Sequence, residues 1–245
     1  MPTRIVCAGD SNTLGQYGVS YVRILAERLS GHDITVTGAG VNGDCSYNLL
    51  QRLDPIIAQR PDAVTLLIGS NDAWSTLSDA NARKIVKRKN LPTPPTLSQY
   101  RENLAAIVAR LRAATDAQIA LVSPPVLGQD LDSPAARASK EFSQVVKTTA
   151  AEQGLAYLPL HERQCEYLDS SGAKLLPFPD GMAERYTSVL QHFLLRRSYD
   201  GIARRRGLAL TADFVHQNSR GATIIADLIE DFVRTSSLIR HSADA

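Results

Sequence analysis

Four short polar motifs in this 245-residue chain carry side chains that together could form and break an ester bond. In chain order they are Gly9-Asp10-Ser11-Asn12, Asn42-Gly43-Asp44, Gly69-Ser70-Asn71-Asp72 and Asp213-Phe214-Val215-His216. They supply a serine hydroxyl, a glycine amide, an asparagine amide and an aspartate–histidine pair. Transfer of an acyl group through a serine ester needs a nucleophile, a base with its orienting carboxylate, and donors for the oxyanion. The combination therefore predicts acyl-transfer chemistry.

The serine and the Asp-x-x-His motif are the candidate reacting groups. Ser11 follows a short apolar run, and a strand-to-helix turn there would project its hydroxyl into a cleft near a helix start. Asp213 and His216 are three residues apart, so on a turn or a first helical turn the carboxylate can reach the near imidazole nitrogen. The far nitrogen is then free to take the serine proton. Taken alone, Ser11 is more typical of a helix cap, and an isolated Asp–His pair is more typical of a solvated surface.

Gly43 and Asn71 are the candidate oxyanion donors. Gly43 has a backbone N–H and no side chain to block the substrate, and Asn71 has a side-chain N–H group. We expect both to act with the backbone N–H of Ser11 on the developing negative charge. In isolation each residue is typical of an ordinary turn.

The elements that must position these residues alternate along the chain. Five apolar runs without polar alternation are typical of strands buried on both faces of a parallel sheet. They are Arg4–Ala8, Asp33–Thr37, Ala63–Ile68, Gln118–Val122 and Leu155–Leu158. Helical patterns cover Val19–Leu29, Tyr47–Ala58, Leu97–Ala114, Ala135–Gln153 and Ser219–Val233. This alternation predicts a right-handed, doubly wound α/β fold.

The order of strands and motifs predicts where the site lies. In doubly wound sheets the ligand binds beyond the carboxyl ends of the strands. Ser11 follows the first apolar run, Gly43 the second and Asn71 the third. We therefore expect all three at one edge of the sheet.

Composition restricts the class of protein. With 44% hydrophobic residues the chain can bury one sizeable core, and we expect a single domain over residues 1–245. The net charge of +2 gives no argument for nucleic acid as a partner. No apolar stretch reaches the roughly 18 residues of a membrane span, and no signal-peptide pattern precedes Ile5. Three cysteines are typical of free thiols in a reducing compartment, so we expect a cytoplasmic protein acting on a small molecule.

Two segments interrupt the alternation. Asn81–Pro95 is basic and proline-rich, and we predict a loop on the active-site side. Residues 161–210 form an insertion that contains an arginine-rich helical stretch, Tyr186–Arg206. We expect its apolar side to pack on the body and its arginines to be solvated. It could alternatively be a lid or rim that attracts anionic or lipid-like substrates, or a contact in a homo-oligomer.

Taken together, the motifs resemble the SGNH subgroup of the GDSL esterases and lipases. Its four signature residues match Ser11, Gly43, Asn71 and His216, and Asp213 completes the triad. The resemblance extends to Ser123-Pro124-Pro125 and to Asn218, Gly221 and Ala222. It implies a flavodoxin-like, three-layer α/β/α fold with a five-stranded sheet. It also implies hydrolysis of esters or thioesters without a metal or cofactor. The chain departs from the pattern at Asn12, where the family name has leucine, and in its insertion.

Three alternatives remain open at this stage. Gly38-Ala39-Gly40-Val41-Asn42-Gly43 spells a dinucleotide-binding pattern, although its expected acidic residue would be Asp62, which precedes the third strand. The same triad could pass its acyl group to a sugar hydroxyl, making an O-acyltransferase. A binding module that kept the fold is the third. No His, Cys or Asp grouping has the spacing of metal ligands.

Overall fold

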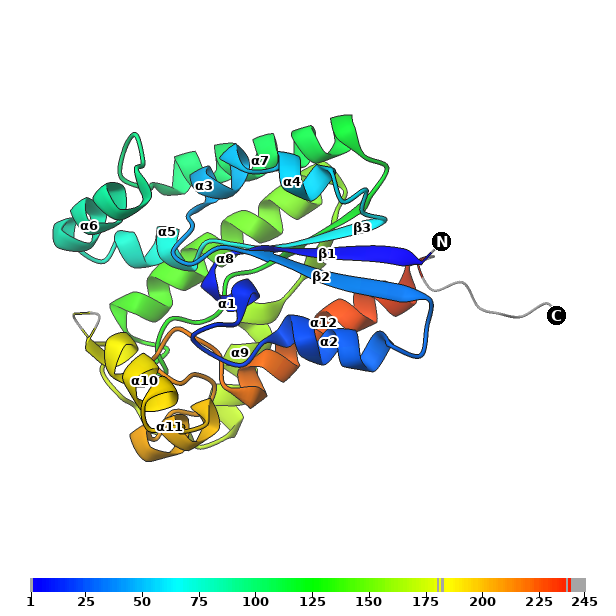
Figure 1. Cartoon of the computed structure of the whole chain (residues 1–245). Helices are drawn as coiled ribbons and strands as arrows, with labels where there is room; N and C mark the ends of the chain where they lie inside the picture. The colour runs from blue at the N-terminus through cyan, green and yellow to red at the C-terminus, as the bar shows by residue number, and fades with distance from the viewer. Residues whose placement is uncertain (1, 180, 182, 237, 239–245) are drawn as a thin grey trace.

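A five-stranded parallel sheet forms the centre of the protein, with strand order β2-β1-β3-β4-β5 (Figure 1). This computed structural model describes residues 2–179, 181, 183–236 and 238. The strands are β1 (Thr3–Gly9), β2 (Ile34–Gly40), β3 (Ala63–Leu67), β4 (Gln118–Val122) and β5 (Ala156–Leu158). All neighbouring pairs run parallel. The predicted five strands and the doubly wound α/β fold are confirmed.

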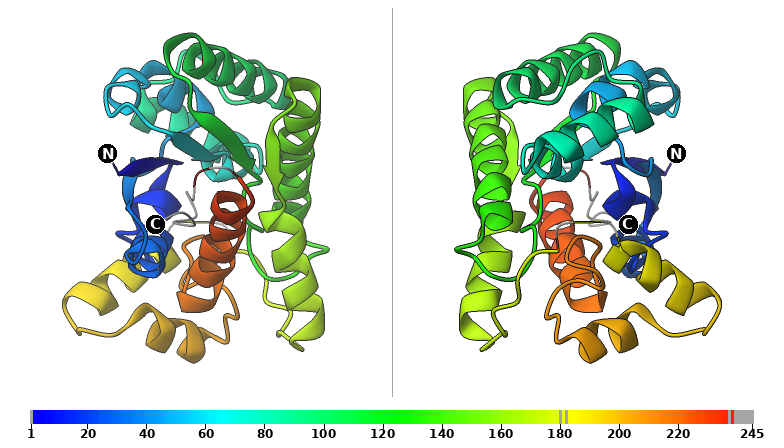
Figure 2. Two further views of the ribbon diagram at one scale, coloured as in Figure 1. Left: turned by 90° about the vertical axis from the view of Figure 1, so that its right-hand side faces the viewer. Right: turned by 90° about the vertical axis from the view of Figure 1, so that its left-hand side faces the viewer.

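Helices cover both faces of the sheet (Figure 2). One face carries α3 (Ser46–Gln51), α4 (Asp54–Ile57), α7 (Leu97–Ala114) and α8 (Pro134–Gln153), and the other carries α2 (Tyr21–Leu29) and α12 (Ser219–Thr235). Helix α9 (Leu160–Ser170) lies beside α12. Two short helices, α1 (Ser11–Leu14) and α5 (Ser70–Ser75), directly follow β1 and β3.

Side chains along each strand alternate between two apolar cores. Val6 and Ala8 of β1 pack in the core under α7 and α8, whereas Ile5 and Cys7 pack in the core under α2 and α12. Every one of these four side chains is fully or almost fully buried. Burial on both faces explains why the runs are apolar without alternation.

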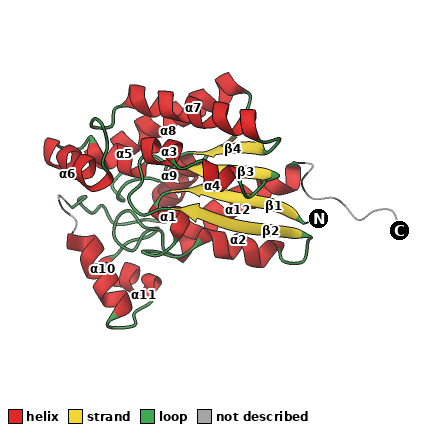
Figure 3. Ribbon diagram, turned by 45° about the horizontal axis from the view of Figure 1, so that its top comes forward, coloured by secondary structure: helices red, strands yellow, loops and turns green. Residues whose placement is uncertain are grey.

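The loops after the strands gather at the carboxyl edge of the sheet (Figure 3). Gly9 ends β1 there and lies so close to its neighbours that a β-carbon would overlap Leu67 O and Thr13 Oγ1. The absence of a side chain at Gly9 thus lets α1 fold back against the strand ends. This brings Ser11 to the edge where Gly43 and Asn71 also lie.

The prediction of a loop over Asn81–Pro95 is wrong for its first half. Helix α6 (Asp79–Lys89) occupies that part, and only residues after Asn90 are irregular. The Ser78 side chain accepts a hydrogen bond from the Asn81 N–H, and Asn90 ends the helix in the left-handed conformation (φ 51°). Because Ile85 is the only buried side chain of α6, the segment shows charge rather than apolar periodicity.

Two predicted helices are each broken in two. Tyr47–Ala58 contains α3 and α4, because Pro55 cannot donate a backbone hydrogen bond inside a continuous helix and instead lies in the first turn of α4. Tyr186–Arg206 contains α10 (Ala183–Phe193) and α11 (Tyr199–Arg206). Arg196 adopts a positive φ of 51°, and the Ser198 side chain caps α11 by accepting from the Gly201 N–H.

The expectation that the apolar side of this stretch packs on the body holds for α11 and is wrong for α10. Tyr199 and Ile202 of α11 are buried. On α10, Tyr186, Leu190 and Phe193 are 64%, 55% and 56% exposed. Helix α10 is instead attached by polar groups, because Arg206 of α11 donates to Ser188 Oγ, to Thr187 Oγ1 and to the Glu184 carbonyl.

Within the described residues, no helix combines the length and the apolar character that a membrane crossing requires.

The close packing at Gly9 gives a stability prediction. Gly9→Ala should lower the free energy of unfolding by about 3 kcal/mol, because the strand ends must shift to admit the methyl group. Gly31→Ala is the matched control, since a β-carbon there meets no atom within 4 Å, and its effect should stay within about 0.5 kcal/mol. Urea unfolding of both variants measures the difference. Equal stabilities would contradict the close packing at Gly9.

Candidate active site

Ser11, His216 and Asp213 form one hydrogen-bonded chain. Ser11 Oγ lies 3.0 Å from His216 Nε2, and His216 Nδ1 lies 2.7 Å from Asp213 Oδ2. The other Asp213 oxygen, Oδ1, accepts the backbone N–H groups of His216 and Val215 at 2.8 and 3.1 Å. All three side chains are buried. The sequence-predicted reacting groups are thus brought together, with the histidine between the hydroxyl and the carboxylate.

A tight loop before α12 holds the aspartate and the histidine in this arrangement. Phe214 has a positive φ of 71°, and the Ala212 N–H donates to the His216 carbonyl at 2.8 Å, which closes the loop. The Phe214 N–H donates to Thr211 Oγ1. The Asp-x-x-His spacing therefore works on a turn, not on the first helical turn of α12.

The serine is fixed by the first turn of α1. Asp10 caps this turn, its Oδ1 accepting the Asn12 N–H at 2.9 Å, and Gly15 ends it in the left-handed conformation. Beyond α1, the ring of Tyr17 meets the His216 ring edge to face, with centroids 5.4 Å apart. Tyr17 therefore covers one side of the imidazole.

The candidate oxyanion donors Gly43 and Asn71 line the same cavity as Ser11. Gly43 has a φ of +76°, a conformation that glycine adopts without strain. Neither the Ser11 nor the Gly43 backbone N–H donates a hydrogen bond to another residue in the described part of the chain. Asn71 Nδ2 donates one hydrogen to the Asp44 carbonyl at 3.0 Å, which orients the amide and leaves its second hydrogen available.

Asp44 is a buried carboxylate that sequence analysis did not single out. Its Oδ2 accepts from Arg52 Nε at 2.6 Å, and its Oδ1 lies 2.6 Å from Lys89 Nζ. Arg52 also donates to the carbonyls of Ala39 and Gly9, at the ends of β2 and β1. These contacts fix the loop that presents Gly43.

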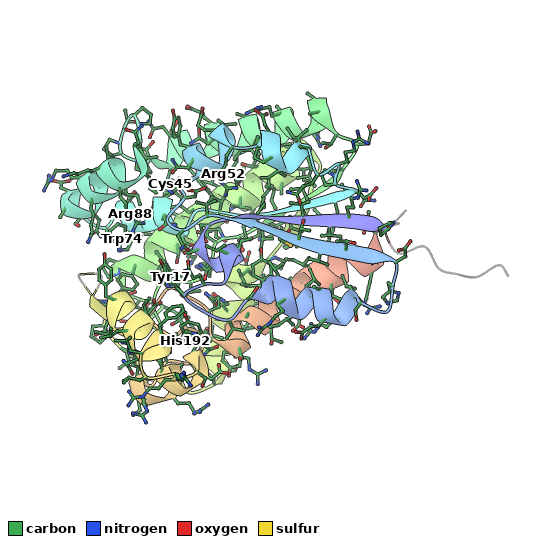
Figure 4. The ribbon with its side chains drawn as sticks, in the orientation of Figure 1. Tyr17, Cys45, Arg52, Trp74, Arg88 and His192 are labelled. Carbon is green, nitrogen blue, oxygen red and sulfur yellow. The ribbon has the colours of Figure 1, made fainter. Side chains whose placement is uncertain are left out.

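A cavity of about 400 Å³ lies over these groups. Its lining includes Ser11, Asn42, Gly43, Asn71 and His216, joined by Tyr17, by Arg88 and Lys89 of α6, and by Tyr186 and Val189 of α10. Figure 4 shows Arg88 on the α6 side of the carboxyl edge and Tyr17 on the α1 side. Arg88 and Lys89 belong to the basic segment Asn81–Pro95 that was predicted on the active-site side, although no role was assigned to either residue. The basic run over residues 83–89 was the available signal.

Two buried carboxyl groups that adjoin Ser11 and Asn71 in the chain have raised pKa values. Burial raises the pKa of Asp10 to about 6, against the hydrogen bond from Asn12. Burial likewise raises the pKa of Asp72 to about 7, against the hydrogen bonds that it accepts from the Ser46 hydroxyl and N–H.

Other candidate features lie apart from this cavity or take structural roles. Gly38 and Gly40 are strand residues that pair with Cys7 and Gly9 of β1, so they do not form a turn at a helix start. The three cysteines are free thiols, as predicted. Within the described ranges, no three His, Cys, Asp or Glu side chains are grouped so as to hold a metal ion.

Comparison with known families identifies the class of this protein. The model of the GDSL-like lipase/acylhydrolase family matches residues 7–224. The chain therefore belongs to this family and is a hydrolase that acts on ester bonds.

Individual relatives are more distant. An acetylxylan esterase from Geobacillus stearothermophilus is 25% identical over 193 residues, which cover 78% of this chain and 82% of that protein. The crystal structure of Axe2, an acetylxylan esterase from the same organism, superimposes with a TM-score of 0.67 at 20% identity, over 98% of this chain and 97% of that one. A lipase/acylhydrolase from Enterococcus faecalis gives a TM-score of 0.64 at 20% identity, over 95% and 96% of the two chains. Both structures share the fold.

The raised pKa of Asp72 predicts how stability depends on pH. A carboxyl group with a higher pKa in the folded state than in the unfolded state favours folding at low pH. This contribution is lost as pH rises from about 4 to 7. Asp72→Asn should reduce this loss of unfolding free energy by on the order of 3 kcal/mol, because asparagine does not ionise. Its amide oxygen still offers an acceptor for the hydrogen bonds from Ser46.

Urea unfolding at pH 5 and pH 8 measures this effect. The decline in unfolding free energy between the two pH values should be smaller in Asp72→Asn than in the wild type. Asp33→Asn, at an exposed aspartate, is the control and should keep the wild-type decline. Parallel curves for the wild type and Asp72→Asn would contradict the assignment.

Proposed function

We propose that this protein is a serine esterase that works through an acyl-enzyme on Ser11. The observation that carries the proposal is the hydrogen-bonded order of Ser11, His216 and Asp213 beneath one cavity. His216 Nε2 takes the Ser11 proton as Oγ attacks the ester carbonyl. Asp213 orients the imidazole and stabilises its charged form. His216 then protonates the leaving alcohol, and water, activated by the same histidine, hydrolyses the acyl-enzyme.

The oxyanion in this scheme is stabilised by three donors. They are the N–H groups of Ser11 and Gly43 and the free side-chain hydrogen of Asn71. Preorganised donors of this kind each contribute about 3 kcal/mol to transition-state stabilisation. The fixed loop around Asp44 supports this assignment, because donors held in advance need no reorganisation during the reaction.

Relatives support the roles and indicate a first substrate. Three solved structures of Axe2 are of catalytic mutants in which a serine, an aspartate or a histidine is replaced by alanine. In that enzyme the aspartate and histidine are three positions apart, as Asp213 and His216 are here. We therefore propose short acyl esters, such as acetyl groups on sugar hydroxyls, as substrates. Tyr186 and Val189 of helix α10 lie in the lining of the cavity and would contact such a substrate.

An O-acyltransferase would use the same groups with a sugar hydroxyl in place of water. Product analysis with and without a xylo-oligosaccharide acceptor separates the two. We expect the free acid as the product whether or not the acceptor is present. Formation of an acylated sugar in the presence of the acceptor would favour the transferase.

The first prediction of the proposed function concerns substrate hydrolysis. The wild type should hydrolyse p-nitrophenyl acetate faster than longer esters in a series up to decanoate. Ser11→Ala should lose at least about 10³-fold in kcat because the nucleophile is gone. A Ser11→Ala variant as active as the wild type, or a wild type inactive on every ester, would refute the proposal.

A second prediction concerns how the reacting groups act together. His216→Ala should lose about as much activity as Ser11→Ala, and the double variant should be little worse than either. The reason is that neither group can promote attack without the other. Circular dichroism of each variant checks that the fold is retained. Multiplicative losses in the double variant would argue against a shared step.

A further inference from the structure

The cavity over Ser11 carries positive charge with no acidic partner in its lining. Of the described residues around it, Arg88 and Lys89 are cationic and none is acidic. Both come from the last turn of α6, the helix that sequence analysis treated as a loop. The charge over the site thus comes from α6 and not from the arginine-rich insertion.

The two cations differ in how they are used. Lys89 Nζ is engaged, because it forms an ion pair with Asp44 and donates to the Asn42 carbonyl at 3.1 Å. Arg88 forms no hydrogen bond or ion pair with any described residue. Its guanidinium therefore keeps its five donors for a ligand.

Arg88 lies directly against a proposed oxyanion donor. A β-carbon on Gly43 would be 3.0 Å from Arg88 Cζ and 3.3 Å from its Nε, so the guanidinium packs over the glycine. Gly43 leaves the room that this placement needs. The charge is thus held at the reacting end of the cavity.

The backbone under Arg88 is anchored on both sides. Asn48 Nδ2 donates to the Lys89 carbonyl at 3.0 Å, and the Leu91 N–H donates to the Val86 carbonyl at 3.1 Å. Because Lys89 is also fixed to Asp44, the end of α6 is held against the Gly43 loop. The exposed Arg88 side chain is thereby presented from an anchored helix end.

We propose that Arg88 is a specificity-determining residue that binds an anionic group on the ester substrate, a carboxylate or a phosphate. The planar guanidinium fork matches two oxygens of such a group, a geometry that a lysine ammonium cannot reproduce. The inference rests on the proposed esterase function and adds to it the substrate class. The anionic group is carried by either the acyl or the alcohol part of the ester.

Two matched ester pairs test the proposal. On the acyl side, the p-nitrophenyl monoester of glutaric acid is compared with p-nitrophenyl valerate. On the alcohol side, 4-acetoxybenzoate is compared with its methyl ester. The readout is the ratio of kcat/KM for the anionic ester to that for its neutral partner, in the wild type, Arg88→Gln, Arg88→Lys and Lys84→Gln.

In at least one pair, Arg88→Gln should lower this ratio about tenfold, and Arg88→Lys should lower it less. The pair that responds tells which part of the ester carries the anion. Lys84→Gln removes an exposed charge one turn earlier on α6, away from the cavity lining, and should keep the wild-type ratio. The wild-type ratio should also fall as sodium chloride is raised from 20 to 500 mM, since salt screens the exposed guanidinium.

Three results would overturn the inference. If the wild type hydrolyses the neutral esters but Arg88→Gln keeps the wild-type ratio in both pairs, Arg88 does not select anions and the esterase proposal stands. If Lys84→Gln lowers the ratio as much as Arg88→Gln, the effect is one of net charge. A wild type inactive on all four esters would refute the esterase proposal, and the Arg88 inference with it.

Discussion

The buried carboxylate of Asp44 is the interaction on which the geometry of the site depends. A charge in that position is tolerated only with full compensation, and it has two cationic partners, Arg52 and Lys89. Arg52 reaches from Asp44 to carbonyls at the ends of β1 and β2, and Lys89 brings in the end of α6. The Asp44 carbonyl orients the Asn71 amide. Three loops and a helix end are therefore positioned by one another, and loss of Arg52 or Lys89 would release the elements that this side chain connects to Asp44.

A second arginine, Arg206, connects the loop of Asp213 and His216 to helix α10. Arg206 donates to the Ala212 carbonyl at 2.8 Å, immediately before Asp213, and to groups on α10. The loop that carries Asp213 and His216 and the helix that contributes Tyr186 are thus connected through one guanidinium. This explains how α10 stays attached although Leu190 and Phe193 are exposed. Polar contacts to the body replace the apolar packing that usually holds a surface helix.

The sequence predicted those features that depend on local pattern, and missed those that depend on which partner a side chain finds. Buried strands read as apolar runs because both faces are covered, and the position of Ser11, Gly43 and Asn71 after successive strands follows from the topology. Helix α6 was missed because most of its charged side chains are exposed and only Ile85 is buried, although Ser78 and Asn90 are recognisable caps. An amphipathic period indicates a helix without saying which side faces the body, so the outward stripe of α10 was not foreseeable.

The charges around the cavity also explain why the cations gather at this edge. Asp10, Asp44 and Asp72 are buried and directly adjoin Ser11, Gly43 and Asn71 in the chain, and together with Asp213 their negative charges would oppose the proposed oxyanion. Burial raises the pKa of Asp72 to about 7, which reduces its negative charge near neutral pH, and it raises the pKa of Asp10 to about 6. Asp44 is matched by two cations, and Asp213 faces His216, which becomes positive as the serine proton is transferred. Arg88 then adds a positive charge beside Gly43, so the balance at the reacting end favours negative charge on the substrate.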